Sequence, residues 1–191
     1  MDDLSQDSFM NVVHNGIKQG IRVSLENKSN AATVILVLSG IDTMAFLNMP
    51  EEQEDVTRKD FIEWADRYIK FPCKEQLKGI DLYGARCGML HQYGTESNCS
   101  RNKTCRRIVY GDDMVPEVRY RPEIDENLVI VSIRGLVDAF FQGVDRFFVK
   151  LYSQKDKARI ADERFEKIVH AFPYRQSDEE DDSTNSTAFL T

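Results

Sequence analysis

The 191-residue sequence is poor in the residues that build metal and nucleophile sites, with only three histidines and four cysteines. His91, Cys99 and Cys105 are separated by gaps wider than the spacing of about two to four residues that is usual in structural zinc pairs, and a fourth ligand is missing. No serine lies in a nucleophile-elbow motif. The sequence therefore predicts no bound metal, no other cofactor and no serine-hydrolase chemistry.

The chain also lacks a signal-peptide pattern and an uninterrupted membrane-length apolar run. Its first residues, Met-Asp-Asp-Leu-Ser-Gln-Asp, are acidic, whereas a signal peptide begins with basic residues. The most apolar stretch, 31–49, contains Ser39, Asp42 and Thr43, which favours a buried bundle helix over a membrane span. We therefore expect a cytoplasmic protein that does not associate with a membrane. In that compartment the cysteines are expected to be free thiols, namely Cys73, Cys87, Cys99 and Cys105.

Negative charge is concentrated at the C-terminal end of the sequence. The net charge is −7, but residues 174–191 alone contain five acidic residues and one arginine. We expect this segment to be a disordered tail and residues 1–173 to form a single domain. Because the domain itself is nearly neutral, a local basic surface remains compatible with the acidic overall composition.

Apolar residues make up 41% of the chain and recur mostly at helical spacing. Helices are expected at 7–26, 31–48, 57–69, 74–93, 134–152 and 156–172, the third capped by Thr57. Between them, 107–110, 117–120 and 128–132 read as short strands. The predicted fold class is therefore mainly all-α, a bundle of five or six helices with a small β-hairpin or strand insertion at about 106–133.

The helix expected at 74–93 carries the most informative pair of residues, Arg86 and His91. A fixed cation that binds phosphate and an imidazole that transfers a proton are sufficient for metal-free RNA cleavage. Helical geometry places the two residues about 140° apart, on opposite flanks of an apolar stripe. This stripe is expected to face the core and consists of Ile80, Tyr83, Cys87 and Leu90. An ordinary surface ion pair and a half-buried histidine remain the alternative.

Two glycines on the same helix, Gly84 and Gly88, lie four residues apart on the His91 side. Glycine lowers helix propensity by about 1 kcal/mol relative to alanine, so two of them suggest close contact with another backbone. That backbone could be the same helix of a second subunit, or another part of the same chain. The first possibility predicts a dimer contact that brings two arginines and two histidines into one cleft.

Arg86-x4-His91, late in a bundle helix, resembles the Arg-x(4–6)-His signature of the HEPN superfamily. Two segments carry the resemblance, Asp81-Leu-Tyr-Gly-Ala-Arg-Cys-Gly-Met-Leu-His-Gln-Tyr93 and Leu38-Ser-Gly-Ile-Asp-Thr-Met-Ala45, and they look like helices of uncharacterised bacterial HEPN-like proteins. Many HEPN domains are dimeric, metal-independent endoribonucleases. One departure is Cys87, a weak hydrogen-bonding residue where active members often carry a polar one.

The resemblance implies a mechanism for a shared cleft between two protomers. Arg86 would hold the scissile phosphate and stabilise its developing charge. His91 would act as general base or acid on the RNA 2′-hydroxyl and the leaving oxygen. The products would be a 2′,3′-cyclic phosphate and a 5′-hydroxyl.

Other residues could support such a site. Asp42, an acid in an apolar helix, could orient His91, pair with Arg86 or simply face solvent. Tyr93 could stack on a base or pack at the helix end. A basic run could follow an RNA backbone or form a solvated loop, and it contains Arg101, Lys103, Arg106 and Arg107.

The leading hypothesis is a homodimeric, metal-independent endoribonuclease in a toxin–antitoxin or phage-defence setting, with an antitoxin or regulatory protein as a further partner. The alternative is a non-catalytic HEPN-like module that binds RNA, a nucleotide or a protein partner. A purely structural helical interaction protein is a third class.

Overall fold

The computed structural model describes residues 9–112, 115 and 117–168. This part is mainly helical with a small three-stranded sheet, which confirms the coarse fold class expected from the sequence. A π-helical segment, Met10–Lys18, leads into α1. The α-helices are α1 (Gln19–Glu26), α2 (Asn30–Asn48), α3 (Arg58–Tyr68), α4 (Gly79–Gln92), α5 (Asn98–Arg101), α6 (Ile133–Tyr152) and α7 (Lys155–Phe165), and the strands are β1 (Arg107–Gly111), β2 (Val118–Tyr120) and β3 (Leu128–Ser132).

Two of the sequence-based predictions concern residues beyond this part. The acidic tail, 174–191, and the last residues of the expected final helix, up to 172, lie outside the described residues. The division into one domain and a tail, and a HEPN-like arrangement of the helices, both stay predictions.

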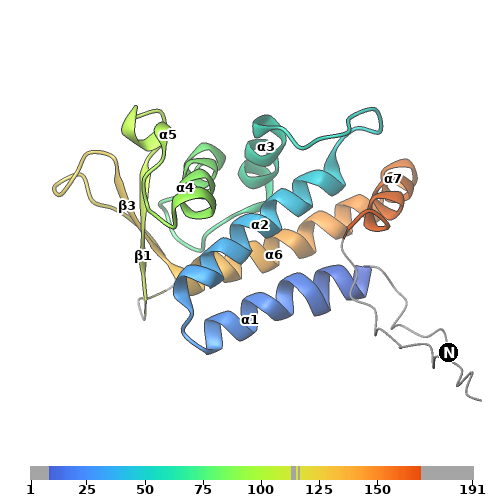
Figure 1. Ribbon diagram of the computed structural model, residues 1–191, viewed down its shortest axis with the longest axis horizontal. Helices are drawn as coiled ribbons and strands as arrows, with labels where there is room; N and C mark the ends of the chain where they lie inside the picture. The colour runs from blue at the N-terminus through green and yellow to red at the C-terminus, as the bar shows by residue number, and fades with distance from the viewer. Residues whose placement is uncertain (1–8, 113–114, 116, 169–191) are drawn as a thin grey trace, which may run out of the picture.

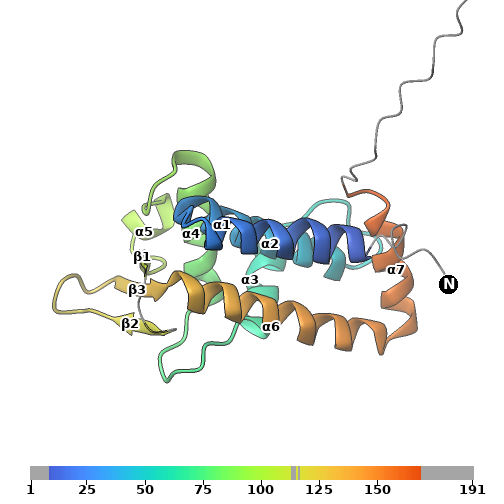
Figure 2. The ribbon, with the colours of Figure 1, turned by 90° about the horizontal axis from the view of Figure 1, so that it is seen from below.

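Helices α2 and α6 run side by side through the centre of the molecule (Figures 1 and 2). The sheet lies at one end of this pair and α7 at the other. Helices α3 and α4 pack together and both contact α2, while α1 packs along α2 elsewhere. Helix α4 is thus held between α2, α3 and the β1 strand, so its residues face several different environments.

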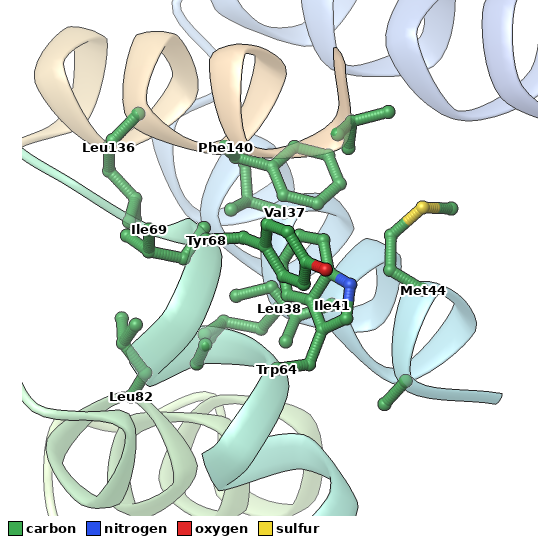
Figure 3. Packing of buried hydrophobic residues seen from close by; sticks show 14 of the residues in the cluster. Val37, Leu38, Ile41, Met44, Trp64, Tyr68, Ile69, Leu82, Leu136 and Phe140 are labelled. Atoms are coloured by element: carbon green, nitrogen blue, oxygen red, sulfur yellow. The ribbon is translucent and has the colours of Figure 1, made fainter. Parts of the chain in front are cut away.

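The core is built around α2, whose apolar side chains point in several directions. Val37, Leu38 and Ile41 are fully buried and pack with Trp64 of α3 and Phe140 of α6 (Figure 3). Burying such a side chain contributes about 1.5–3 kcal/mol. Among the described helices α2 alone is long and apolar enough to cross a membrane, but these side chains are covered by the protein itself.

The C-terminal end of α2 is closed by a buried arginine from α7. The last carbonyl groups of a helix have no partners within the helix. The Arg164 guanidinium donates hydrogen bonds to the carbonyl oxygens of Phe46, Met49 and Pro50. Burial lowers the pKa of Arg164 below its ordinary value. Helix α7 is therefore tied to the end of α2 by hydrogen bonds as well as by apolar packing.

The start of α3 follows the sequence pattern, whereas the start of α4 does not. Thr57 caps α3 and forms a capping box with Asp60, as predicted. Helix α4 was expected from residue 74 but begins at Gly79. The side chain of Gln76 binds the backbone of Phe71 and Cys73, which holds the preceding segment as a loop. Short helix α5, begun by a Ser97 cap, was not expected at all.

The three strand-like runs in the sequence do form strands. The strand order is β1-β3-β2, so β3 lies in the middle. Strand β1 is parallel to β3, with Arg107 opposite Leu128, and β2 is antiparallel to β3, with Val118 opposite Val131. The apolar residues Ile108, Val129 and Val131 are buried among the helices. The insertion is therefore a β2–β3 hairpin to which β1 adds in parallel.

A buried ion pair joins the sheet to the beginning of α4. Asp81 is only 2% exposed and accepts hydrogen bonds from Arg106 at 2.8 Å from the backbone N, 3.0 Å from Nε and 2.7 Å from Nη2. The remaining donors of Arg106 reach Glu75 and the carbonyl of Gln76. Burial acts to lower the pKa of Arg106, but the contact with Asp81 outweighs it and raises that pKa. The charges of Asp81 and Arg106 therefore neutralise each other in the interior.

Asp81→Ala is expected to lower the free energy of unfolding by about 3–5 kcal/mol, because it leaves the Arg106 guanidinium without its buried counter-charge. Chemical denaturation followed by circular dichroism measures this loss. Glu126→Ala, which removes the exposed partner of Lys103, is the control and should leave the unfolding midpoint nearly unchanged. A loss below about 1 kcal/mol for Asp81→Ala would show that the ion pair does not stabilise the fold.

Candidate functional site

Helix α4 carries both residues of the Arg86-x4-His91 motif. Its first backbone amide, on Gly79, donates to Asp66 Oδ1 at 2.5 Å, and the Lys78 amide donates to Asp81 Oδ2 at 3.0 Å. These bonds satisfy amides that have no partner within the helix and hold α4 against α3. The position of Arg86 and His91 is thereby set by the packing of a rigid element.

Arg86 pairs with Asp42 of α2. Its Nε lies 3.0 Å from Asp42 Oδ2, and both side chains are about one-quarter exposed, at 27% and 26%. Of the three arrangements open to Asp42, the structure shows the pairing with Arg86. The terminal nitrogens of Arg86, Nη1 and Nη2, donate to no oxygen in the described part of the chain. The guanidinium is therefore oriented through one nitrogen while its outer edge stays available.

The pKa values of both members of the pair are raised, for different reasons. Desolvation raises the pKa of Asp42, because burial outweighs the attraction of Arg86. Burial also acts to lower the pKa of Arg86, but the hydrogen bond and the charge of Asp42 raise it overall. An ionised Asp42 is thus unfavourable to the folded state even beside its partner. Its carboxylate orients the Arg86 guanidinium without adding stability.

Next to Arg86, Cys87 and Tyr83 form a half-buried polar contact. The Cys87 thiol lies near both the Tyr83 hydroxyl and the Arg86 guanidinium. Desolvation, and then the proximity of Cys87, raise the pKa of Tyr83. The Arg58 guanidinium of α3 lies 5.2 Å from the centre of the Tyr83 ring. A row of contacts thus runs from Arg58 through Tyr83 and Cys87 to Arg86 and Asp42.

His91 lies apart from this row. It is exposed, and in the described part of the chain it has no hydrogen-bond or ion-pair partner. Five residues along an α-helix separate it from Arg86 by about 140° around the axis and about 7.5 Å along it. The structure therefore brings together Arg86, Asp42 and Cys87, but does not bring His91 to the same group within one chain.

The stripe between Arg86 and His91 is not the core face that the sequence predicted. Its four residues, Ile80, Tyr83, Cys87 and Leu90, are only half-buried. The fully buried residues of α4 lie on the other side of the helix and include Asp81, Leu82, Gly84, Ala85, Gly88 and Met89. The prediction was wrong because residues 94–106 cover the other face of the helix, which the helical spacing of apolar residues does not reveal. The half-buried stripe is an apolar surface flanked by Arg86 and His91.

Gly84 and Gly88 pack closely against a later segment of the same chain. A β-carbon on Gly84 would lie 2.3 Å from Cys105 Sγ, and one on Gly88 would lie 2.7 Å from the carbonyl oxygen of Glu96. The segment that follows α4, residues 94–105, therefore covers this face of the helix. The close approach expected from the two glycines therefore occurs within the chain, and a dimer contact at these glycines stays a prediction.

Tyr93 ends α4 in a left-handed conformation, with φ 54°. A bulky residue rarely adopts this conformation, which is usually left to glycine at a helix end. The ring is nevertheless 67% exposed, so it does not pack in the core. His91 and Tyr93 thus project into solvent at the same end of α4, with one exposed residue between them.

The basic run is largely occupied by contacts within the protein. Arg106 is held by Asp81 and Glu75, and RNA binding by this residue stays a prediction. Exposed Lys103 pairs with Glu126, and Arg107 lies 3.1 Å from Asp125. Of the four, Arg101 alone has no carboxylate partner among the described residues, and it donates to Asn98 at 2.5 Å. RNA binding by Arg101, Lys103 and Arg107 stays a prediction.

Two residues of this region were not anticipated. Arg58 could not be connected with Tyr83 from sequence alone, because the two residues are distant in the chain and on different helices. Asp81 has a recognisable signal, since it stands three residues after Lys78 at the start of a helix, the spacing of a capping contact.

In the described residues, no three His, Cys, Asp or Glu side chains gather as a metal ion would require.

Gly88→Ala is expected to lower the free energy of unfolding by about 1–3 kcal/mol, since the added methyl group would press on the carbonyl oxygens of Gly94 and Glu96. Gly20→Ala in α1 is the matched control, because its nearest side-chain atom is 3.9 Å away. This control should gain about 1 kcal/mol from helix propensity. Equal effects of the two substitutions in thermal denaturation would contradict the packing of segment 94–105 on Gly88.

Tyr93→Gly is expected to raise the free energy of unfolding by about 1 kcal/mol, because glycine adopts the left-handed conformation without steric cost. Tyr93→Phe keeps both the ring and the unfavourable conformation and should leave stability unchanged. Urea denaturation of the three proteins provides the measurement. A clear loss of stability for Tyr93→Gly would mean that the ring stabilises the fold.

Comparison of the chain with family models, curated proteins and solved structures gives no match. The resemblance to HEPN domains therefore rests on Arg86, His91 and the two helical segments that carry the similarity.

Proposed function

We propose that the protein is a metal-independent endoribonuclease of the HEPN type that acts as a homodimer. One observation carries the proposal: Arg86, oriented by Asp42, and exposed His91 flank the half-buried apolar stripe of α4. This arrangement provides an oriented cation and an accessible imidazole on either side of a surface that another protein molecule can cover.

A second copy of the chain is necessary because one α4 cannot direct both side chains at a single phosphate. In the proposed dimer, the stripes of two α4 helices pack across a two-fold axis. Each contact is then made twice, and Arg86 of one protomer approaches His91 of its partner. Leu90 and Tyr83 would become fully buried in this interface, which adds apolar burial to the association.

In the proposed reaction, neutral His91 removes the proton from an RNA 2′-hydroxyl, and the resulting oxygen attacks the adjacent phosphorus. The bond to the 5′-oxygen breaks, and this oxygen takes up the proton that His91 removed, which leaves a 2′,3′-cyclic phosphate and a 5′-hydroxyl. The outer nitrogens of Arg86 donate to the phosphate oxygens, whose charge increases in the transition state. Tyr93 provides an exposed ring at the His91 end of α4 on which an unpaired base can stack.

The second candidate is a module that binds RNA, a nucleotide or a protein partner without cleaving it. It is favoured by the neutralisation of Arg86 by Asp42, together with the pairing of Lys103 and Arg107. A guanidinium that already faces a carboxylate stabilises a phosphate less than a free one does. Binding to such a module would still use the exposed edge of Arg86 and the ring of Tyr93.

Purified dimeric protein is expected to cleave single-stranded RNA in excess EDTA and to leave 2′,3′-cyclic phosphate ends. Arg86→Ala and His91→Ala should each lower the rate by about 10²–10⁴-fold, the usual effect of removing a charge-stabilising or proton-transferring group. Product ends are identified by mass spectrometry, and cleavage is followed on denaturing gels.

Two neighbouring substitutions serve as controls. Gln92→Ala changes the exposed residue beside His91, and Lys59→Ala removes an exposed cation of α3, so neither should alter the rate. Absence of EDTA-resistant cleavage by the dimeric wild type would exclude the enzyme. RNA binding that weakens steeply with salt, and weakens further in Arg86→Ala and Tyr93→Gly, would then support the non-catalytic module.

A further inference from the structure

The segment that covers α4 contains two of the four cysteines and reverses direction between them. Lys103, two residues after the end of α5, is left-handed, with φ 56°. The Thr104 amide donates to the Cys99 carbonyl at 2.9 Å, and the Lys103 amide donates to the Ser100 carbonyl at 3.1 Å. This pattern is a Schellman motif, which reverses the chain direction. The turn brings the chain back to Cys99 directly before Cys105, with the Thr104 hydroxyl also donating to the Cys99 carbonyl at 3.1 Å, so Cys105 lies near Cys99.

The two thiols have different environments. Cys105 is 5% exposed and packs against Gly84 of α4, where a β-carbon would touch its sulfur. Cys99, on α5, is half-buried and can be reached from solvent. Desolvation, and then the proximity of Cys99, raise the pKa of Cys105 to about 12, so Cys105 stays a thiol at neutral pH. Cys99 is consequently the thiol that meets a soluble reagent first.

We infer that Cys99 and Cys105 form a dithiol site that a peroxide oxidises to an intramolecular disulfide. This site is separate from the row of contacts around Arg86, and the inference does not depend on the proposed function. The two other cysteines are placed differently. Cys73 donates to the carbonyl oxygen of Glu75, and Cys87 contacts Tyr83 and Arg86.

The oxidation proceeds in two steps. The Cys99 sulfur attacks one oxygen of hydrogen peroxide, the O–O bond breaks, and a sulfenic acid and water form. The Cys105 sulfur then attacks the Cys99 sulfur, the S–O bond breaks, and the hydroxide leaves as water with the proton of Cys105. Two thiols are oxidised by two electrons in total, and the peroxide is reduced to two water molecules. A dithiol reductant reverses the change.

The disulfide would fix the turn that lies over the glycine face of α4. Cross-linking restricts the unfolded chain, so the oxidised protein should unfold at a higher temperature than the reduced one. The covalent link joins Cys99 to Cys105 within the segment and would restrict the turn that packs on Gly84.

Peptide mapping tests the site directly. Cleavage after Glu96 by a glutamate-specific protease, and after Arg101, Lys103 and Arg106 by trypsin, places the two cysteines on the peptides 97–101 and 104–106. Full-length protein is treated with a small excess of hydrogen peroxide, its free thiols are alkylated, and it is digested without reduction. The expected product is these two peptides joined, lighter by two hydrogens than their sum, and separated again by dithiothreitol.

Cys99→Ser removes the accessible thiol and should abolish both the linked product and the rise in melting temperature on oxidation. Cys73→Ser should retain both effects. The inference is overturned if Cys99 and Cys105 are both alkylated after peroxide treatment, or if Cys99 is linked to Cys87 instead. Oxidation of Cys99 to a sulfinic acid while Cys105 stays alkylatable would overturn it as well. Because Cys99 is half-buried, the Cys99→Ser protein should fold, which circular dichroism verifies.

Discussion

The buried pair between Asp81 and Arg106 connects the start of α4 with the loop before it and with the sheet. Asp81 lies in the first turn of α4, and Arg106 directly precedes β1, so one interaction joins helix and sheet. The same guanidinium reaches Glu75 and Gln76 in the loop that leads into α4. With both ends fixed in this way, residues 94–105 are held over the glycine face of the helix. Replacing the pair by apolar residues could preserve stability, but removing one member cannot.

Two features at the Arg86–His91 motif, one from α2 and one at the end of α4, cost stability. Asp42 has a raised pKa beside Arg86, and Tyr93 occupies a conformation that suits glycine. Local departures of this kind are often found at functional sites, where the surrounding packing maintains them. Both departures lie at the motif, one next to Arg86 and one two residues after His91. They are the physical reason for regarding this end of α4 as a binding or catalytic surface.

Local patterns in the sequence predicted the helices and strands well, but they predicted less well which residues pack against each of them. The Thr57 cap and the strand-like runs were recognisable because they depend on neighbouring residues. The loop before α4 was missed because Gln76 folds back on residues that resemble a helix start. The buried face of α4 was misassigned because its covering comes from residues 94–106, and no periodicity in 79–92 reveals that cover. The ion-pair partners of the basic residues could not be predicted from the sequence either. Arg106, for example, meets Asp81 only because the turn before it brings the chain back to α4.

The strand order has a consequence for the way the chain folds during synthesis. Strand β3 occupies the middle of the sheet but is the last of the three to be made. Until residue 132 has emerged, β1 has no hydrogen-bonding neighbour and β2 has none either. Helix α6 follows directly and supplies Phe140 to the core around α2. The N-terminal helices must therefore wait, partly exposed, for the second half of the chain, and folding is expected to be cooperative and late rather than sequential.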